Sequence, residues 1–136
     1  MSYNSQQYGR QETAKKIVVL TDQNYVDEAD RIMKNLNTRL TTSKIRSILT
    51  MVSDIYNDVR RSRQEKLDSQ MQSRVQYLRL HIAYEAGRDK DVKTFVSEAG
   101  LLEQIKAIGD DKTKLIRFCH YMEALVAYHR FYGGKD

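Results

Sequence analysis

The sequence predicts an all-α protein, a compact bundle of about five helices with a flexible N-terminal arm. Two observations predict this class. The 136 residues contain no proline and six glycines, whereas β-rich and loop-rich proteins usually need more of both at their turns. Apolar residues also recur three and four positions apart along most of the chain, which is the spacing of one helix face. A chain of this length can bury a single core, so we expect one domain.

The N-terminal part of the chain differs in composition from the rest. Residues 1–16 are polar and cannot bury enough surface to order themselves, so we expect a flexible arm. The aliphatic run over residues 17–20 is expected to dock on the domain as a short extended piece. We therefore divide the chain into a flexible N-terminal segment, residues 1–22, and a helical-bundle domain, residues 23–136.

Cap residues indicate where the first two helices begin. Asp22 is a plausible N-cap for a first helix, because apolar residues over 26–36 follow helical spacing. A second helix is expected to open at Thr41-Thr42-Ser43, where a hydroxyl can accept an otherwise unbonded backbone N–H. Its apolar stripe over residues 45–59 is the clearest periodic signal in the chain.

Glycines and aspartates separate the remaining helices. The third helix is expected to end at Gly87, in the left-handed conformation of a C′ residue. Either Asp89 or Asp91 caps a fourth helix, and Gly100 separates that helix from a short one that follows. The last helix is predicted from about Asp111 to residue 132, before a pair of glycines.

The residues that usually carry catalysis or bind metals show no workable pattern. His120 and His129 fall on opposite sides of the last helix, and His81 stands alone on the third. His129 lies within an apolar arc, where a buried histidine bonded to a carbonyl or a tyrosine is favoured over a general base or an RNA contact. Cys119 projects toward the apolar side of its helix, where cysteine behaves as a small hydrophobe. We therefore expect no enzyme activity, no metal site and no cofactor.

The cysteine and hydropathy patterns bear on location. One cysteine excludes an intrachain disulfide and fits a reducing cytoplasm. The longest aliphatic run has four residues, far too few for a membrane span. We expect a cytoplasmic protein without a membrane partner.

Basic residues are the more informative feature. Lys and Arg number 23 against 18 Asp and Glu, a net charge of +5 that suggests a polyanionic partner. Arg46 and Arg60 lie on one face of the second helix, about 21 Å apart at a rise of ~1.5 Å per residue. On the third helix, Arg74, His81 and Arg88 form a similar line.

Two tyrosines adjoin the second of these lines. Tyr77 and Tyr84 stand beside it, and single-stranded RNA is commonly bound by cations at phosphates together with rings that stack on bases. The simpler interpretation is that each line is the solvated flank of an amphipathic helix, with tyrosines at the edges of the bundle.

Three sequence stretches resemble a known family. They are LTTSKIR over residues 40–46, YEAGR over residues 84–88 and FCHYMEALVAYHRFY over residues 118–132. In this order and at these separations, they resemble the small subunit of type III-A (Csm-type) CRISPR–Cas effector complexes, which act in antiviral defence. The likeness spans about residues 40–132.

The resemblance implies a non-catalytic helical subunit, present in several copies, that binds target and guide RNA through positive charge and supports a filament. Its implied partners are these RNAs, the backbone and large subunits, and neighbouring copies of itself, with the cleavage reactions belonging to other subunits. It points to Lys44, Arg46, Arg88 and Lys93 as RNA-binding residues. The basic lines and helix geometry add Arg60, Arg74 and Arg117. Tyr121, Tyr128 and Tyr132 are assigned to packing first.

Two other functions compete with this interpretation. The third and fourth helices could form a helix-turn-helix that binds DNA, with Lys90, Lys93 and Thr94 facing a groove. A protein-bridging helical adaptor is the other alternative, and it would leave the basic lines solvated.

Overall fold

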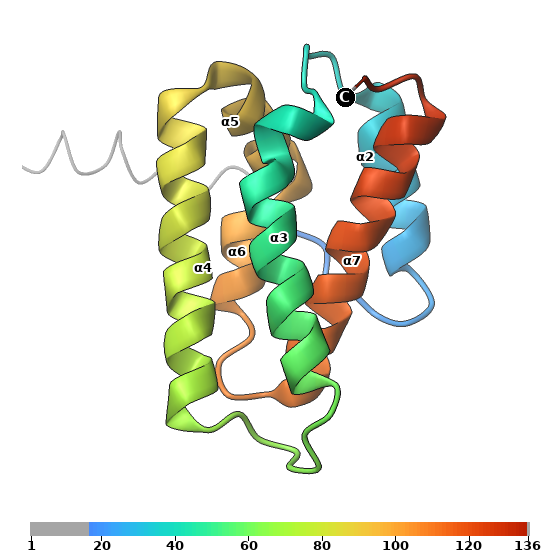
Figure 1. Ribbon diagram of the computed structural model, residues 1–136. Coiled ribbons are helices and arrows are strands. Elements are labelled where there is room, and N and C mark those ends of the chain that lie inside the picture. Colours follow the sequence, from blue (N-terminus) through green and yellow to red (C-terminus); the bar gives the residue numbers. More distant parts are fainter. Residues whose placement is uncertain (1–16, 136) are drawn as a thin grey trace, which may run out of the picture.

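Six helices account for most of residues 17–135, the part of the chain that the computed structural model describes (Figure 1). They are α2 (Tyr25–Asn35), α3 (Thr42–Val59), α4 (Ser69–Arg88), α5 (Lys90–Ala99), α6 (Leu101–Lys106) and α7 (Lys112–Phe131). Between residues 17 and 135 the only β-type pairing consists of two isolated bridges. The all-α class is confirmed. The sequence predicted about five helices, and the structure has six over residues 17–135 when the short α6 is counted. The predicted arm over residues 1–16 lies outside the described range.

Side-chain caps start three of the six helices where the sequence indicated. The Thr41 side chain accepts from the backbone N–H of Lys44 at the start of α3. Asp89 and Asp111 likewise accept backbone N–H groups in the first turns of α5 and α7. Gly100, at φ +63°, takes the left-handed conformation that separates α5 from α6. These caps confirm four predicted boundaries, because local hydrogen bonding decides them.

Two predicted boundaries are wrong. The N-cap of α2 is Asn24 rather than Asp22, because Thr21 and Asn24 bond each other in a turn that delays the helix. Gly87 is not a left-handed C′ residue, since α4 continues through it to Arg88. Asp89, in an extended conformation, ends α4 and caps α5, so a single residue separates the two helices.

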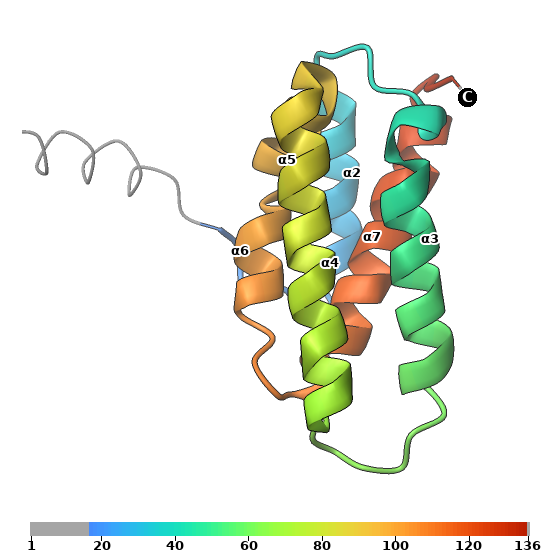
Figure 2. The ribbon, with the colours of Figure 1, turned by 60° about the vertical axis from the view of Figure 1, so that its left-hand side comes forward.

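The helices close into a ring around one core. In Figure 1, α4, α3 and α7 lie side by side in front, with α5, α6 and α2 behind them. Figure 2 shows the same arrangement turned, with α4 forward and α2 at the rear. The ring closes because α2 packs against α5 on one side and most extensively against α7 on the other. Every helix contributes buried apolar side chains, and the largest include Tyr121, Phe95 and Phe118.

The segment before α2 also packs on the bundle. Leu20 is buried, and the Gln104 side-chain amide of α6 donates to the backbone carbonyl of Val18 at 2.7 Å. The side chain of Ile17 lies against Gly100, where an added Cβ would come within 2.9 Å of it. Residues 17–20 therefore dock against α6 and the α5–α6 junction.

Candidate nucleic-acid interface

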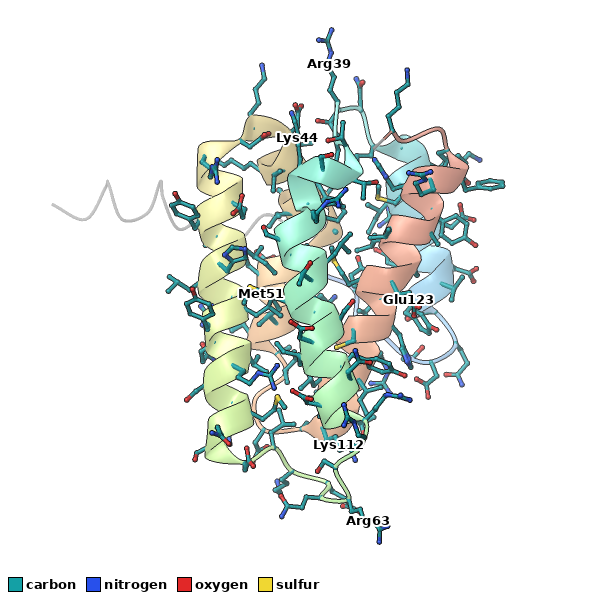
Figure 3. The ribbon with its side chains drawn as sticks, viewed as in Figure 1. Arg39, Lys44, Met51, Arg63, Lys112 and Glu123 are labelled. Carbon is teal, nitrogen blue, oxygen red and sulfur yellow. The ribbon has the colours of Figure 1, made fainter. Side chains whose placement is uncertain are left out.

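An open groove of about 780 Å³ runs between α3 and α4 and collects several of the residues predicted from the sequence. We call it the α3–α4 groove. Lys44 and Met51, labelled in Figure 3, come from its α3 wall. Its lining consists of Ser43, Lys44, Arg46, Ser47, Thr50 and Met51 from α3, with Tyr77, His81, Glu85 and Arg88 from α4 and Asp89 after it.

Two arginines in this groove are available to a ligand. Arg46 is exposed on α3, and no carboxylate in residues 17–135 lies within 4.0 Å of it. Arg88 ends α4 with 61% of its side chain exposed, in a loose 3.6 Å ion pair with Glu85. Its guanidinium also lies over the ring of Tyr84, 5.7 Å from the centroid. The structure thus brings together two predicted residues from different helices.

Lys44 lines the same groove but is engaged within the protein. Its ammonium lies 2.7 Å from a carboxylate oxygen of Asp91 and 3.5 Å from one of Asp89, at the start of α5. This hydrogen bond to Asp91 raises the pKa of Lys44. Asp91 also accepts from the Thr38 hydroxyl at 2.5 Å, and these two bonds lower the pKa of Asp91 to about 2. Lys44 therefore joins α3 to α5, a role that its sequence motif does not reveal.

Arg60 and Arg74 lie toward the other end of α3 and α4. The Arg60 guanidinium sits 5.9 Å above the ring of Tyr56, which lines a different groove between α3 and α7. Arg74 is half-buried and forms a 2.7 Å ion pair with Asp58 across the two helices. Neither residue lines the α3–α4 groove, so the predicted line from Arg46 to Arg60 does not continue along it.

Lys93 and Arg117 lie apart from the groove. Lys93 is exposed on α5. Arg117 is 21% exposed on α7, and its Nε donates to Asp22 at 3.2 Å. It lines a hollow formed by residues 17–20, α6 and α7. Arg117 thus helps to hold the segment before α2 against α7.

Three exposed side chains mark the outer face of α4. Tyr77 is 61% exposed and Tyr84 is 63% exposed, which fits both a ring that meets a partner and a solvated edge of the bundle. Leu80 lies between them and is 64% exposed, which sequence reasoning missed. The spacing of residues 77, 80 and 84 follows one helix face, so this stripe was visible in the sequence as a second apolar face on α4.

His129, His120 and Cys119 occupy structural positions. His129 is buried and its Nε2 donates to the carbonyl oxygen of Leu40 at 2.9 Å, which confirms the favoured interpretation. His120 lies 3.4 Å from the hydroxyl of Tyr56. Burial raises the pKa of the Cys119 thiol to about 12, so it is no thiolate nucleophile near neutral pH. The Nε2 of His81 lies 3.0 Å from the hydroxyl of Ser47 across the α3–α4 groove.

Two further properties concern the described residues as a whole. Within residues 17–135, no three His, Cys, Asp or Glu side chains cluster closely enough to hold a metal ion. Each helix in that range is too short or too polar to span a bilayer.

Comparison with known proteins decides the family. The family model described as Csm2 Type III-A matches residues 19–135, nearly all of the described chain. This chain belongs to the Csm2 family of type III-A. The resemblance inferred from three short stretches is therefore confirmed, and it extends from residue 19 rather than from about residue 40.

Curated relatives agree with the Csm2 family model. A protein of Streptococcus thermophilus named "CRISPR system Cms protein Csm2" is 47% identical over 126 residues, which cover 88% of this chain and all of the relative. A protein of the same name from Mycobacterium tuberculosis H37Rv is 40% identical over 82% of this chain and 94% of the relative. One from Enterococcus italicus is 35% identical over 71% of each chain.

The α4–α5 junction bears on the alternative of a DNA-binding regulator. A helix-turn-helix joins its helices by a turn of about three or four residues. Here only Asp89 separates α4 from α5, and α5 has ten residues. The geometry does not match that motif.

Proposed function

We propose that this Csm2-family chain is a non-catalytic subunit of a type III-A CRISPR complex that binds RNA along the α3–α4 groove. The observation that carries the proposal is the convergence of Arg46 and Arg88, from two helices, on one open groove beside exposed tyrosines. Arginine binds phosphate oxygens well, and aromatic rings offer stacking surfaces for unpaired bases. The proposed ligands are the target and guide RNAs of the complex.

Charge in the groove favours binding without sequence readout. Arg46 and Arg88 present cations, while Glu85 and Asp89 keep the net charge of the groove modest. Phosphate contacts position a nucleic acid without reading its sequence, and they make affinity depend on salt. The remaining predicted residues rank lower. Lys44, Arg74 and Arg117 are in ion pairs of 2.7 to 3.2 Å, closer than the 3.6 Å pair of Arg88. Arg60 and Lys93 lie outside the groove.

Replacing Arg46 or Arg88 with Ala tests the proposal. Each change is expected to weaken RNA binding about equally for every sequence. It should also reduce the salt slope by about 0.7 for a single strand, or about 0.9 for a duplex, because one fewer counterion is released. The melting temperature should barely move, since an exposed arginine usually contributes about 0.5 kcal/mol or less. Binding titrations over a range of salt concentrations, with thermal melts of the same samples, provide the measurement.

Arg63→Ala is the matched control for this experiment. Arg63 is exposed in the loop between α3 and α4, and Figure 3 shows it at the end of the bundle opposite Arg39. This variant removes one positive charge far from the groove, so its RNA affinity should depend on salt concentration nearly as that of the wild type does. If both groove variants melt early and keep the wild-type slope, the RNA surface has been placed wrongly.

The non-catalytic role is a separate prediction. Its support is the inert environment of Cys119 and the engagement of His129 and His120 in structural bonds. Purified protein incubated with RNA, with and without divalent metal, is expected to leave the RNA intact on a denaturing gel. Cleavage that persists through further purification steps and follows the protein peak would contradict this role.

We also propose that neighbouring copies and the backbone and large subunits of the complex contact this chain through its exposed apolar side chains. The main candidates for these contacts are Leu80, on α4, and Phe131, which is 74% exposed at the end of α7. Phe131 belongs to a cluster of three rings with Tyr128 and Tyr132, whose centroids are 5.0 to 6.2 Å apart. Large exposed apolar groups of this kind commonly mark protein interfaces.

A further inference from the structure

A hydrogen-bonded hydroxyl–imidazole pair joins the two walls of the α3–α4 groove. There the hydroxyl of Ser47, on α3, lies 3.0 Å from Nε2 of His81, on α4. The carboxylate of Glu85 lies close to that imidazole, with its Oε2 3.7 Å from the same nitrogen. His81 is seven residues from Arg88, which corresponds to about 10.5 Å along α4. The hydroxyl–imidazole pair therefore sits beside a phosphate-binding position rather than on it.

This pair has unused hydrogen-bonding capacity. A serine hydroxyl has one donor and two acceptor lone pairs, and its bond to the imidazole uses one of these three. If Ser47 donates to His81, two lone pairs remain on its oxygen. If His81 donates instead, Ser47 keeps its own donor and one lone pair. In either case the Ser47 oxygen can bond a group that both donates and accepts.

Charge at this point selects the part of a nucleic acid that fits. Phosphate oxygens only accept, and the Glu85 carboxylate repels them because it is itself an anion and an acceptor. A ribose 2′-hydroxyl is neutral and both donates and accepts, and it is the group that distinguishes RNA from DNA. Glu85 lies 3.7 Å from His81 and 3.6 Å from Arg88, so its negative charge disfavours a phosphate directly at the Ser47–His81 pair.

We propose that the Ser47–His81 pair binds a ribose 2′-hydroxyl and so makes the α3–α4 groove specific for RNA over DNA. This inference rests on the proposed function, since it assumes that a nucleic acid lies in the groove. It assigns Ser47 and His81 a role in choosing the ligand, separate from the general phosphate binding by Arg46 and Arg88.

The test compares RNA and DNA single strands of one sequence on the full chain. Ser47→Ala and His81→Phe should each lower RNA affinity about two- to tenfold, the effect of one lost hydrogen bond, and leave DNA affinity unchanged. Ser47→Thr keeps a hydroxyl and should keep the preference for RNA. Ser53→Ala is the matched control, because Ser53 is an exposed serine of α3 that lines the α3–α7 groove instead.

A chemical probe keeps the test independent of any variant. RNA with 2′-fluoro groups retains an RNA-like sugar shape but lacks the hydroxyl, so wild-type protein should bind it as weakly as DNA. Wild-type binding of 2′-fluoro RNA as tight as that of RNA would overturn the inference, since shape alone would then explain the preference. Equal loss of RNA and DNA affinity in Ser47→Ala would overturn it as well.

The two levels of the proposal fail in different ways. If Arg46→Ala and Arg88→Ala leave RNA binding and its salt slope unchanged, the groove is not the RNA site and the proposed function fails. If those variants weaken both nucleic acids while wild-type protein binds RNA and DNA equally, only the 2′-hydroxyl inference fails.

Discussion

At the scale of single residues, Lys44 and Arg46 show why neighbours in one motif can have different roles. The two residues are two positions apart, and both were predicted to bind phosphate. Lys44 points toward the start of α5, where Asp89 and Asp91 neutralise it, and Arg46 faces solvent beside the groove. The difference comes from carboxylates more than 40 positions later in the chain, so no local pattern could reveal it.

Asp91→Asn tests the structural role of this ion pair through its pH dependence. The pKa of Asp91 is lowered to about 2 by the bonds from Lys44 and Thr38, against an ordinary value of 3.8. A carboxyl group whose pKa is lower in the folded state stabilises the protein above its unfolded pKa, and this contribution is lost as the pH falls through the folded pKa. At neutral pH the variant should therefore melt below the wild type.

The gap between the two proteins should close between about pH 4 and pH 2. Below that window both side chains are uncharged. Denaturant or thermal melts of both proteins from pH 7 to pH 2 provide the measurement. Parallel curves across the whole range would show that the charge on Asp91 contributes nothing to folding.

At the scale of elements, two glycines differ in whether the structure has room for a side chain at their position. Gly87 lies inside α4, and an added Cβ there would meet nothing within 4 Å. Gly134 follows α7, and an added Cβ there would come within 2.3 Å of the imidazole of His129. Its own N–H donates to the carbonyl of His129, and the carbonyl of the next residue, Lys135, accepts from Thr42. The C-terminal residues thus close over His129 and reach the start of α3.

Substituting alanine at each glycine should have opposite effects on stability. Gly87→Ala is expected to stabilise the protein by about 0.5–1 kcal/mol, because alanine is the better helix former and loses less backbone freedom on folding. Gly134→Ala is expected to destabilise it by about 1–3 kcal/mol through overpacking against the buried ring. Urea titrations of both variants give the two free energies of unfolding. A destabilising Gly87→Ala would mean that α4 ends at this glycine in solution, as the sequence first suggested.

At the scale of the whole molecule, the described core begins in the segment before α2. Leu20 belongs to the cluster of buried side chains, and Arg117 bonds Asp22. The division of the chain at residue 22 remains a proposal, and truncation can locate it.

Two truncations separate the arm from the domain. A chain that begins at residue 17 should keep its helical circular dichroism and melt within about 3 °C of the full chain, because residues 1–16 are polar. A chain that begins at residue 23 should melt earlier, since burial of a leucine side chain such as Leu20 contributes about 1.5–3 kcal/mol. A large loss of stability in the first truncation would show that the arm is part of the fold. Equal melting of the two truncations would place the boundary at residue 22.

Much of the architecture followed from the sequence because its causes are local. Apolar spacing predicted the helices, and hydroxyl and carboxylate caps at Thr41, Asp89 and Asp111 predicted where three of them begin. The buried state of His129 and Cys119 followed from their places on an apolar helix face. The absence of proline and the three short stretches were enough to indicate the fold class and the family.

The tertiary structure decided which charges are free and which side chains meet. The predicted cap at Asp22 was wrong because a turn before Asn24 delays the start of α2. The predicted end of α4 at Gly87 was wrong because Asp89 both ends α4 and caps α5. Arg46 and Arg88 share a groove and Ser47 meets His81 because α3 and α4 pack side by side. Arg74 and Arg117 are paired with carboxylates that are distant in the sequence. Spacing along a helix fixes the face on which a residue lies. The packing of the neighbouring helices fixes what that face meets.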